Sequence, residues 1–111
     1  MAAGGCGVSS PTQRSKEFLE SRGYLVAVVE KWNPHARVRQ DLFGFIDLLA
    51  VKEGETLAVQ TTSRSNMSSR ARKIAEHENT PTVRRAGWGI EIHGWAKDTR
   101  GRWNVKVQNV S

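Results

Sequence analysis

The stretch that most constrains the fold is GFIDLLAVKEGETLAVQTTS, residues 44–63. Two short apolar runs flank the polar segment KEGE, and such runs joined by a glycine-containing turn predict an antiparallel β-hairpin. We expect its strands at about Phe43–Val51 and Thr56–Thr62. The first strand contains an acid, Asp47. A polar group inside an apolar strand must be hydrogen-bonded, bind a ligand or cost stability.

The segments before the hairpin predict one helix and one further strand. Ser10 as N-cap and Pro11 at the first helical position open a helix over residues 11–22. The aromatic and β-branched run YLVAVVE predicts a buried strand at 24–30. The polar segment 31–41 is expected to be a loop or an irregular edge strand.

The segments after the hairpin predict a second helix and a closing strand pair. Ser68 or Ser69 caps a helix that runs until Asn79, with its apolar residues on one face. The segments 87–95 and 102–110 alternate apolar and polar residues, which predicts an antiparallel pair with one solvated face. The order is therefore helix, three strands, helix, two strands.

Length and grouping of apolar residues predict one α/β domain, at 10–111, with a central mixed sheet flanked by helices. Residues 1–9, MAAGGCGVS, are expected to be a flexible leader. The single cysteine, Cys6, cannot form an internal disulfide, no apolar run has the length of a membrane span, and the leader does not have the order of a secretory signal. We therefore expect a soluble cytoplasmic protein without a membrane partner.

The charge balance is strongly basic. Seventeen Lys and Arg residues against eleven Asp and Glu give a formal net charge of +6 and a pI near 10.1. This balance favours a polyanionic partner, and nucleic acid is the first candidate. Charge alone is equally compatible with a small basic protein that has no such partner.

Polar residues in the two hairpin strands predict a cluster at one sheet edge. Adjacent strands can bring Asp47 together with Gln60 and Thr62, and such a group of oxygen ligands has the geometry of a metal site. A second interpretation stays open. Asp47 could brace a loop through backbone N–H groups, while residues 60–62 end a strand where it meets water.

On these residues the chain resembles the PD-(D/E)XK nuclease superfamily, in particular its small Holliday-junction-resolvase-like and VRR-NUC-like members. Gly44, Asp47 and the rest of the hairpin are similar to the superfamily's acid at a strand bend, its turn and its acid-x-lysine strand. The order of elements agrees over residues 10–108. The resemblance implies a restriction-endonuclease-like αβββαββ fold, Mg²⁺- or Mn²⁺-dependent hydrolysis of phosphodiester bonds, and a nucleic-acid substrate, with DNA favoured over RNA.

The resemblance also implies which residues would act. Asp47 falls on the first acid and Gln60 on the second, while Thr62 falls on the lysine. Gln60 can still offer an amide oxygen to a metal, but the lost charge is worth on the order of a few kcal/mol. Glu17 and Glu30 are the acids available to assist, Glu30 as a metal ligand and Glu17 as a catalytic group.

Thr62 cannot supply a cation, so a lysine must come from elsewhere if the site is active. Lys73 on the following helix is the first candidate and Arg64 the second. The basic and aromatic residues expected to contact nucleic acid are Arg37, Arg39, Arg64, Arg70, Arg72 and Trp32. Trp32, in a polar loop, is the tryptophan expected to stack on a base, whereas the other three are expected to pack in the core.

Two other classes of function stay open. The changes at positions 60 and 62 suit a nuclease-like module, or a non-catalytic subunit, that binds nucleic acid without cutting it. The third class is a protein-interaction domain whose basicity is incidental. Members of the superfamily often dimerise to act on two strands, so the resemblance implies a homodimer, although the sequence identifies no dimer face.

Overall fold

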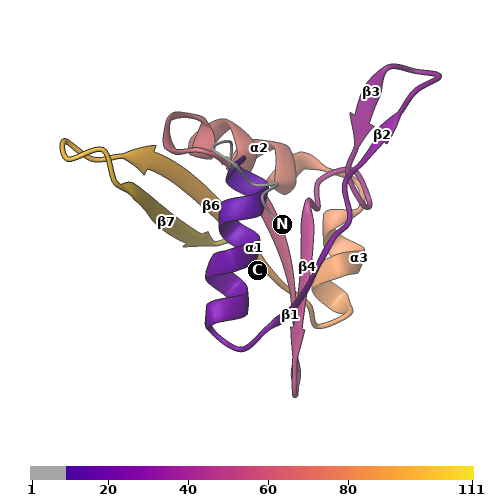
Figure 1. Cartoon of the computed structure of the whole chain (residues 1–111). Coiled ribbons are helices and arrows are strands. Elements are labelled where there is room, and N and C mark those ends of the chain that lie inside the picture. Colours follow the sequence, from indigo (N-terminus) through magenta and orange to yellow (C-terminus); the bar gives the residue numbers. More distant parts are fainter. Residues whose placement is uncertain (1–9) are drawn as a thin grey trace.

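A five-stranded mixed sheet forms the centre of the computed structural model, which describes residues 10–111 (Figure 1). In spatial order its strands are β1 (Leu25–Val28), β4 (Leu48–Lys52), β5 (Glu55–Ser63), β6 (Gly89–Lys97) and β7 (Trp103–Asn109). β5 and β6 run parallel, and the other neighbouring pairs are antiparallel. The expected α/β class and central mixed sheet are confirmed. The leader predicted at 1–9, with Cys6, lies outside the described residues.

Helices cover both faces of the sheet. α1 (Pro11–Ser21) packs on one face, and α2 (Met67–Glu76) and α3 (Thr80–Arg85) pack on the other (Figure 1). The core under α1 consists of Leu19, Val26, Leu48, Ala50, Leu57 and Val59. The core on the opposite face consists of Phe45, Ile46, Ala58, Met67, Ile74, Val83, Ile90 and Ile92.

α1 begins where the sequence predicts and is fixed to the sheet by buried polar contacts. The Ser10 hydroxyl accepts a hydrogen bond from the Gln13 backbone N–H at 3.1 Å, which caps the helix. The fully buried Ser15 hydroxyl accepts from Trp95 Nε1 at 2.9 Å and lies 2.9 Å from His93 Nδ1. His93 Nε2 lies 3.1 Å from a carboxylate oxygen of Glu91. Ser15 lies on the side of α1 that is buried against the sheet. This Ser–His–Glu chain therefore holds the helix in place and offers no accessible nucleophile.

The predicted hairpin is confirmed, but its first strand is shorter than expected. β4 begins at Leu48 rather than near Phe43, and the turn to β5 consists of Glu53 and Gly54. Residues 41–47 instead form a tight loop in which the Leu42 N–H donates to the Ile46 carbonyl at 2.9 Å. Phe43 and Gly44 both have positive φ, of 54° and 90°, which is incompatible with a strand.

The second predicted helix is also shorter, and a further helix follows it. A 3₁₀ turn, η2 (Arg64–Asn66), precedes α2, so the N-cap is Asn66 rather than Ser68 or Ser69. The helix ends at Glu76 rather than Asn79 because His77 is extended. α3 was not predicted from the sequence, where Pro81 indicated only a helix end. Pro81 lies in the first turn of α3, a position where its missing N–H costs nothing.

The segment expected as a loop or an irregular edge strand is a separate two-stranded ribbon. β2 (Lys31–Asn33) pairs with β3 (Val38–Gln40), and the ribbon projects from the body of the molecule (Figure 1). Asn33 orders its turn, since the Asn33 side-chain oxygen accepts from the N–H groups of His35 and Ala36 at 3.0 and 3.1 Å.

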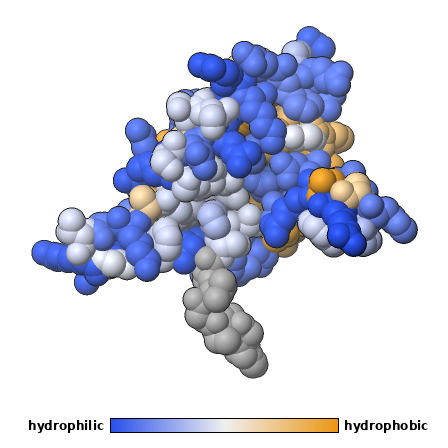
Figure 2. All heavy atoms as spheres, turned by 90° about the horizontal axis from the view of Figure 1, so that it is seen from above, coloured by the Kyte–Doolittle hydropathy of each residue, from blue (hydrophilic) through white to orange (hydrophobic). Residues whose placement is uncertain are grey.

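The face seen in Figure 2 is covered mainly by hydrophilic residues, and apolar residues are exposed there only in small patches. The exposed large apolar residues of the described chain are Leu25, Val28, Trp32, Val38, Phe43, Val51, Trp103 and Val107. Among residues 10–111, no helix combines the length and the apolar character needed to cross a membrane.

The 41–47 loop is held against α2 and α3, and a substitution at Gly44 tests this anchor. A Cβ at Gly44 would overlap the His77 imidazole and would require φ of +90°. We expect Gly44→Ala to lower the free energy of unfolding by more than the about 1–2 kcal/mol of a left-handed alanine alone. Urea denaturation measures this change.

Gly54→Ala is the matched control. Gly54 also has positive φ, but nothing lies within 4 Å of the added Cβ. Gly54→Ala should therefore lower the free energy of unfolding only by the cost of an alanine in the left-handed region. Equal destabilisation by the two substitutions would contradict the packing of Gly44 against His77.

Candidate functional site

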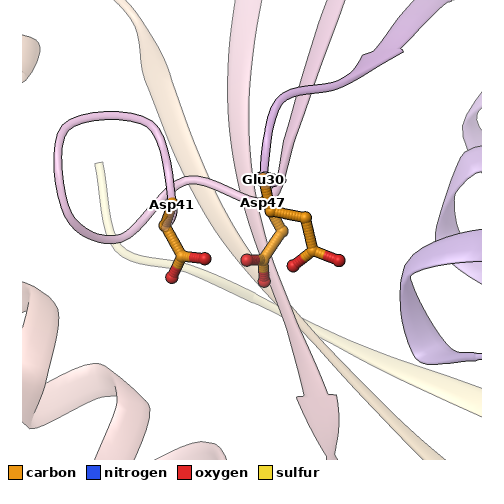
Figure 3. A group of neighbouring side chains, drawn as sticks. All are labelled: Glu30, Asp41 and Asp47. Atoms are coloured by element: carbon orange, nitrogen blue, oxygen red, sulfur yellow. The ribbon is translucent and has the colours of Figure 1, made fainter. Parts of the chain in front are cut away.

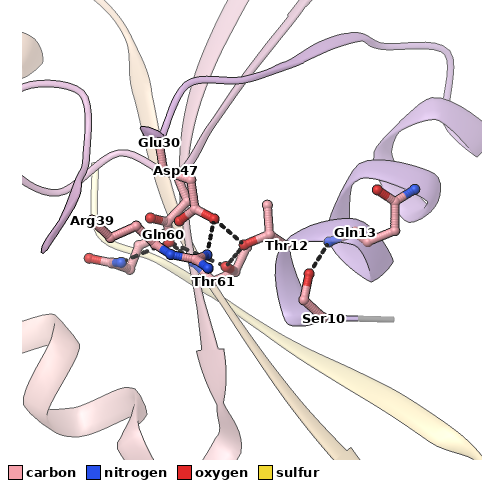
Figure 4. Close-up of polar contacts among 8 residues, drawn as sticks. All are labelled: Ser10, Thr12, Gln13, Glu30, Arg39, Asp47, Gln60 and Thr61. Atoms are coloured by element: carbon pink, nitrogen blue, oxygen red, sulfur yellow. Dashed lines mark hydrogen bonds and ion pairs between the residues drawn. The ribbon is translucent and has the colours of Figure 1, made fainter. Parts of the chain in front are cut away.

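Asp47 lies directly before β4 and is the centre of a buried polar cluster. Its side chain is 4 % exposed, and Oδ2 accepts hydrogen bonds from Gln60 Nε2 at 2.9 Å, Thr61 N at 2.8 Å and Thr61 Oγ1 at 3.2 Å (Figure 4). The predicted convergence of Asp47 and Gln60 is therefore confirmed, although Asp47 lies in the bend before β4 rather than within a strand. All three of these donors reach the same carboxylate oxygen.

Two further carboxylates join Asp47 (Figure 3). Glu30 follows β1, and Asp41 follows β3 at the start of the 41–47 loop. One carboxylate oxygen from each of the three residues lies within 4.8 Å of the others. Like charges this close oppose one another unless a proton or a cation compensates them.

The pKa values of two of these acids reflect that crowding. Burial and the neighbouring Asp47 carboxylate raise the pKa of Asp41 from 3.8 to about 6, although Lys73 opposes the shift. Burial also raises the pKa of Asp47, against the lowering effect of the Thr61 backbone N–H, while the nearby Glu30 adds to the rise. Raised carboxylate pKa values within one cavity are typical of functional sites, although structural clusters also produce them.

The buried amide of Gln60 lies beside this cluster with its nitrogen turned toward Asp47. Gln60 is 3 % exposed, and its Oε1 has no hydrogen-bond partner in the structure, while its Nε2 donates to Asp47. An unsatisfied buried carbonyl costs on the order of 1–3 kcal/mol. The three carboxylates form an all-oxygen donor set, which fits a hard divalent cation such as Mg²⁺ or Mn²⁺.

The cluster lies in an open cavity of about 480 Å³ that also contains cations. Arg39 Nη1 lies 2.8 Å from a Glu30 carboxylate oxygen, and Lys73 Nζ lies 3.7 Å from Asp41 Oδ2. Arg70, one turn before Lys73 on α2, lines the same cavity. Acids that could hold a cation and basic groups that could hold a phosphate therefore share one space.

The structure does not bring Glu17 to this cavity, contrary to the sequence-based expectation. Thr12, Ser15 and Leu19 face the sheet at helical spacing. Glu17 lies two positions from both Ser15 and Leu19, so it points away from the sheet. Its exposed carboxylate accepts a hydrogen bond from Gln13 Nε2 at 3.2 Å.

The residues expected to contact nucleic acid are only partly gathered. Arg39 and Arg70 line the cavity, whereas Arg72 is exposed on α2 outside it. Arg64 Nη2 donates to the Asn104 carbonyl on β7 at 3.2 Å. Arg37 and Trp32 are exposed on the β2–β3 ribbon.

Sequence reasoning missed Asp41. It precedes Asp47 by six residues in DLFGFID, so the spacing expected of a strand would have placed the two acids far apart. The positive φ angles of Phe43 and Gly44 fold the segment back and bring the carboxylates together. The only signal in the sequence was a glycine between two acids.

Comparisons with protein-family models, with curated proteins and with solved structures find no match for this chain. The case for a function therefore depends on the geometry of the cavity.

The raised pKa of Asp41 predicts a specific dependence of stability on pH. Between pH 3.8 and about pH 6, Asp41 keeps a proton in the folded protein that it has lost in the unfolded chain. The contribution of Asp41 to the free energy of unfolding is therefore complete at low pH and is lost as the pH rises through about 6. Urea denaturation at a series of pH values measures it.

The comparison is with Asp41→Asn, which cannot titrate. Asp98, whose pKa is lowered by the Arg102 N–H and by Asn104, contributes a slope of the opposite sign to both proteins. The difference between wild type and variant removes the contribution of Asp98 and reports the titration of Asp41 together with its effect on Asp47. Parallel pH profiles of the two proteins would show that Asp41 is not perturbed.

Proposed function

We propose that this protein hydrolyses phosphodiester bonds in nucleic acid with a divalent metal ion in the cavity around Asp47. The observation that carries the proposal is the meeting of Glu30, Asp41 and Asp47 with Lys73 and Arg70 in one open cavity. In a chain with net charge +6, a cluster of acids surrounded by cations is suited to a metal ion and a phosphate together.

The element order supports a restriction-endonuclease-like fold. Without the β2–β3 ribbon and α3, the chain follows α1, three antiparallel strands, α2 and two closing strands, and β6 is parallel to β5. This is the αβββαββ order that the resemblance implies. Asp47 stands at the bend before the second of those core strands, and Gln60 lies on the third.

The two departures from the superfamily's pattern have replacements in the same cavity. Gln60 leaves the second acid position without charge, and Asp41 supplies a carboxylate from the loop. Thr62 leaves the lysine position without a cation, and Lys73 supplies an ammonium group from α2. In the proposed site, a carboxylate and an ammonium group are thus both present, although different positions of the chain provide them.

In the proposed reaction, Glu30, Asp41 and Asp47 would hold the ion. Gln60 would add its amide oxygen only if its amide turned, because its nitrogen faces Asp47. A bound Mg²⁺ or Mn²⁺ would polarise the phosphate and lower the pKa of a bound water. Thr61 fixes the orientation of the Asp47 carboxylate through its N–H and hydroxyl. Lys73 and Arg70 are placed to neutralise phosphate oxygens as charge develops on them.

Removing the central carboxylate tests the proposal. We expect wild-type protein with Mg²⁺ or Mn²⁺ to cut a DNA substrate and Asp47→Asn to lose at least about a hundredfold in rate, because a unit charge beside the cation is worth a few kcal/mol. Branched, duplex and single-stranded DNA should each be assayed.

The same variant should also lose the rise in melting temperature that the divalent ion gives wild type. Failure of wild type to cut any of the three substrates, together with no effect of either ion on its melting temperature, would remove the proposal.

Lys73 is tested against a basic neighbour on the same helix. We expect Lys73→Ala to slow cleavage about 10²- to 10³-fold, as loss of one group that stabilises transition-state charge does. Arg72→Ala removes a positive charge outside the cavity and should keep the wild-type rate. Equal losses in both variants would mean that only the overall charge matters.

A second candidate is a nuclease-like module that binds nucleic acid without cutting it. It is favoured by the orientation of Gln60, which turns its amide nitrogen rather than its oxygen toward Asp47 and helps to satisfy that carboxylate without a metal. Such a module would bind DNA in a salt-dependent manner, and EDTA would not change its affinity. The enzyme, by contrast, would need the divalent ion for cleavage.

A further inference from the structure

We infer that the β2–β3 ribbon is an arm that binds unpaired nucleotides, with Trp32 as the surface on which a base stacks. This inference deepens the proposed function, on which it rests, because it names the substrate class: nucleic acid with a single-stranded segment next to the cleaved phosphate.

Trp32 differs from the other three tryptophans in having no interaction partner among residues 10–111. Trp88 packs against Phe43 with ring centroids 6.1 Å apart, and Trp103 lies under the Arg14 guanidinium at 3.7 Å. Trp95 contacts the Phe18 ring and donates to Ser15. The Trp32 side chain is 59 % exposed, and within residues 10–111 no ring, cation or hydrogen-bond partner contacts it.

The register of the ribbon places Trp32 beside the cavity. Trp32 lies directly opposite Arg39 in the antiparallel pair, so the two side chains share one face of the ribbon. Arg39 in turn contacts Glu30 and lines the cavity. A nucleotide chain whose phosphate is held by Arg70 and Lys73 would therefore reach Trp32 along the Arg39 side.

Charge favours nucleic acid over a protein partner for this arm. Residues 31–40 contain three cations, Lys31, Arg37 and Arg39, and no acid. Cations beside an exposed aromatic ring are the combination that single-stranded nucleic acid binds, through its backbone and through its bases. The turn is ordered by Asn33, so the arm is formed before binding.

An unpaired base is also what the geometry selects. A ring that projects from a narrow two-stranded ribbon can stack on a base only when that base is free of its own neighbours. In a continuous duplex the bases are stacked on one another, and the arm could reach only the backbone. Trp32 should therefore affect binding of single strands and leave binding of duplex unchanged.

The test is binding in EDTA, which excludes cleavage from the measurement. Short oligothymidylate and a duplex of the same length are titrated against wild type, Trp32→Ala, Trp32→Phe and Val38→Ala. We expect Trp32→Ala to weaken oligothymidylate binding by about fivefold to a hundredfold, Trp32→Phe to keep most of it, and duplex binding to be the same in both. Stacking should also quench tryptophan fluorescence in wild type more than in Trp32→Phe.

Val38→Ala is the control, because Val38 is an exposed apolar residue of the same ribbon. It lies opposite Asn33, on the face away from Trp32. Wild-type affinity for oligothymidylate in Trp32→Ala, or an equal loss in Val38→Ala, would overturn the inference and point to a protein partner. An equal loss on duplex would also overturn it. Absence of cleavage with Mg²⁺ would remove the proposed enzyme but leave this binding result intact.

Discussion

The site depends on one buried carboxylate. Asp47 is almost entirely removed from water, so it must be hydrogen-bonded or protonated, and β5 provides the donors through Gln60 and Thr61. The Thr61 hydroxyl also lies 2.9 Å from the hydroxyl of Thr12 on α1. A helix, a loop and two strands thus meet at this carboxylate, and the cavity takes its shape from their meeting.

The cavity is more crowded with charge than hydrogen bonding alone would require. Donors to Asp47 would stabilise a single buried carboxylate, yet Glu30 and Asp41 approach it as well, and Arg39 and Lys73 pair with them. Such a network is costly unless each member is balanced. A cation among the carboxylates and a phosphate on the basic groups would balance it further, and this is the physical basis of the proposed function.

The β2–β3 ribbon extends this surface beyond the sheet. One of its cations, Arg39, also lines the cavity. The ribbon forms a two-stranded sheet of its own, separate from the five-stranded sheet. In the proposed function, the cavity beside the sheet would carry out hydrolysis and the ribbon would determine substrate specificity.

The amino-acid sequence by itself determined the local elements whose signals are strong. The capped start of α1, the hairpin of β4 and β5 with its glycine turn, and the alternating closing strands all follow from propensity and periodicity. The hairpin pairing also predicts the meeting of Asp47 with Gln60.

Only the tertiary structure decided which distant residues complete the site. Asp41 enters because two residues with positive φ fold the 41–47 loop back, and Glu17 stays out because the sheet-facing stripe of α1 turns it to solvent. Lys73 reaches Asp41 because α2 packs beside β5. Backbone reversal and helix phase depend on packing between segments far apart in the chain, and local sequence patterns do not encode that packing.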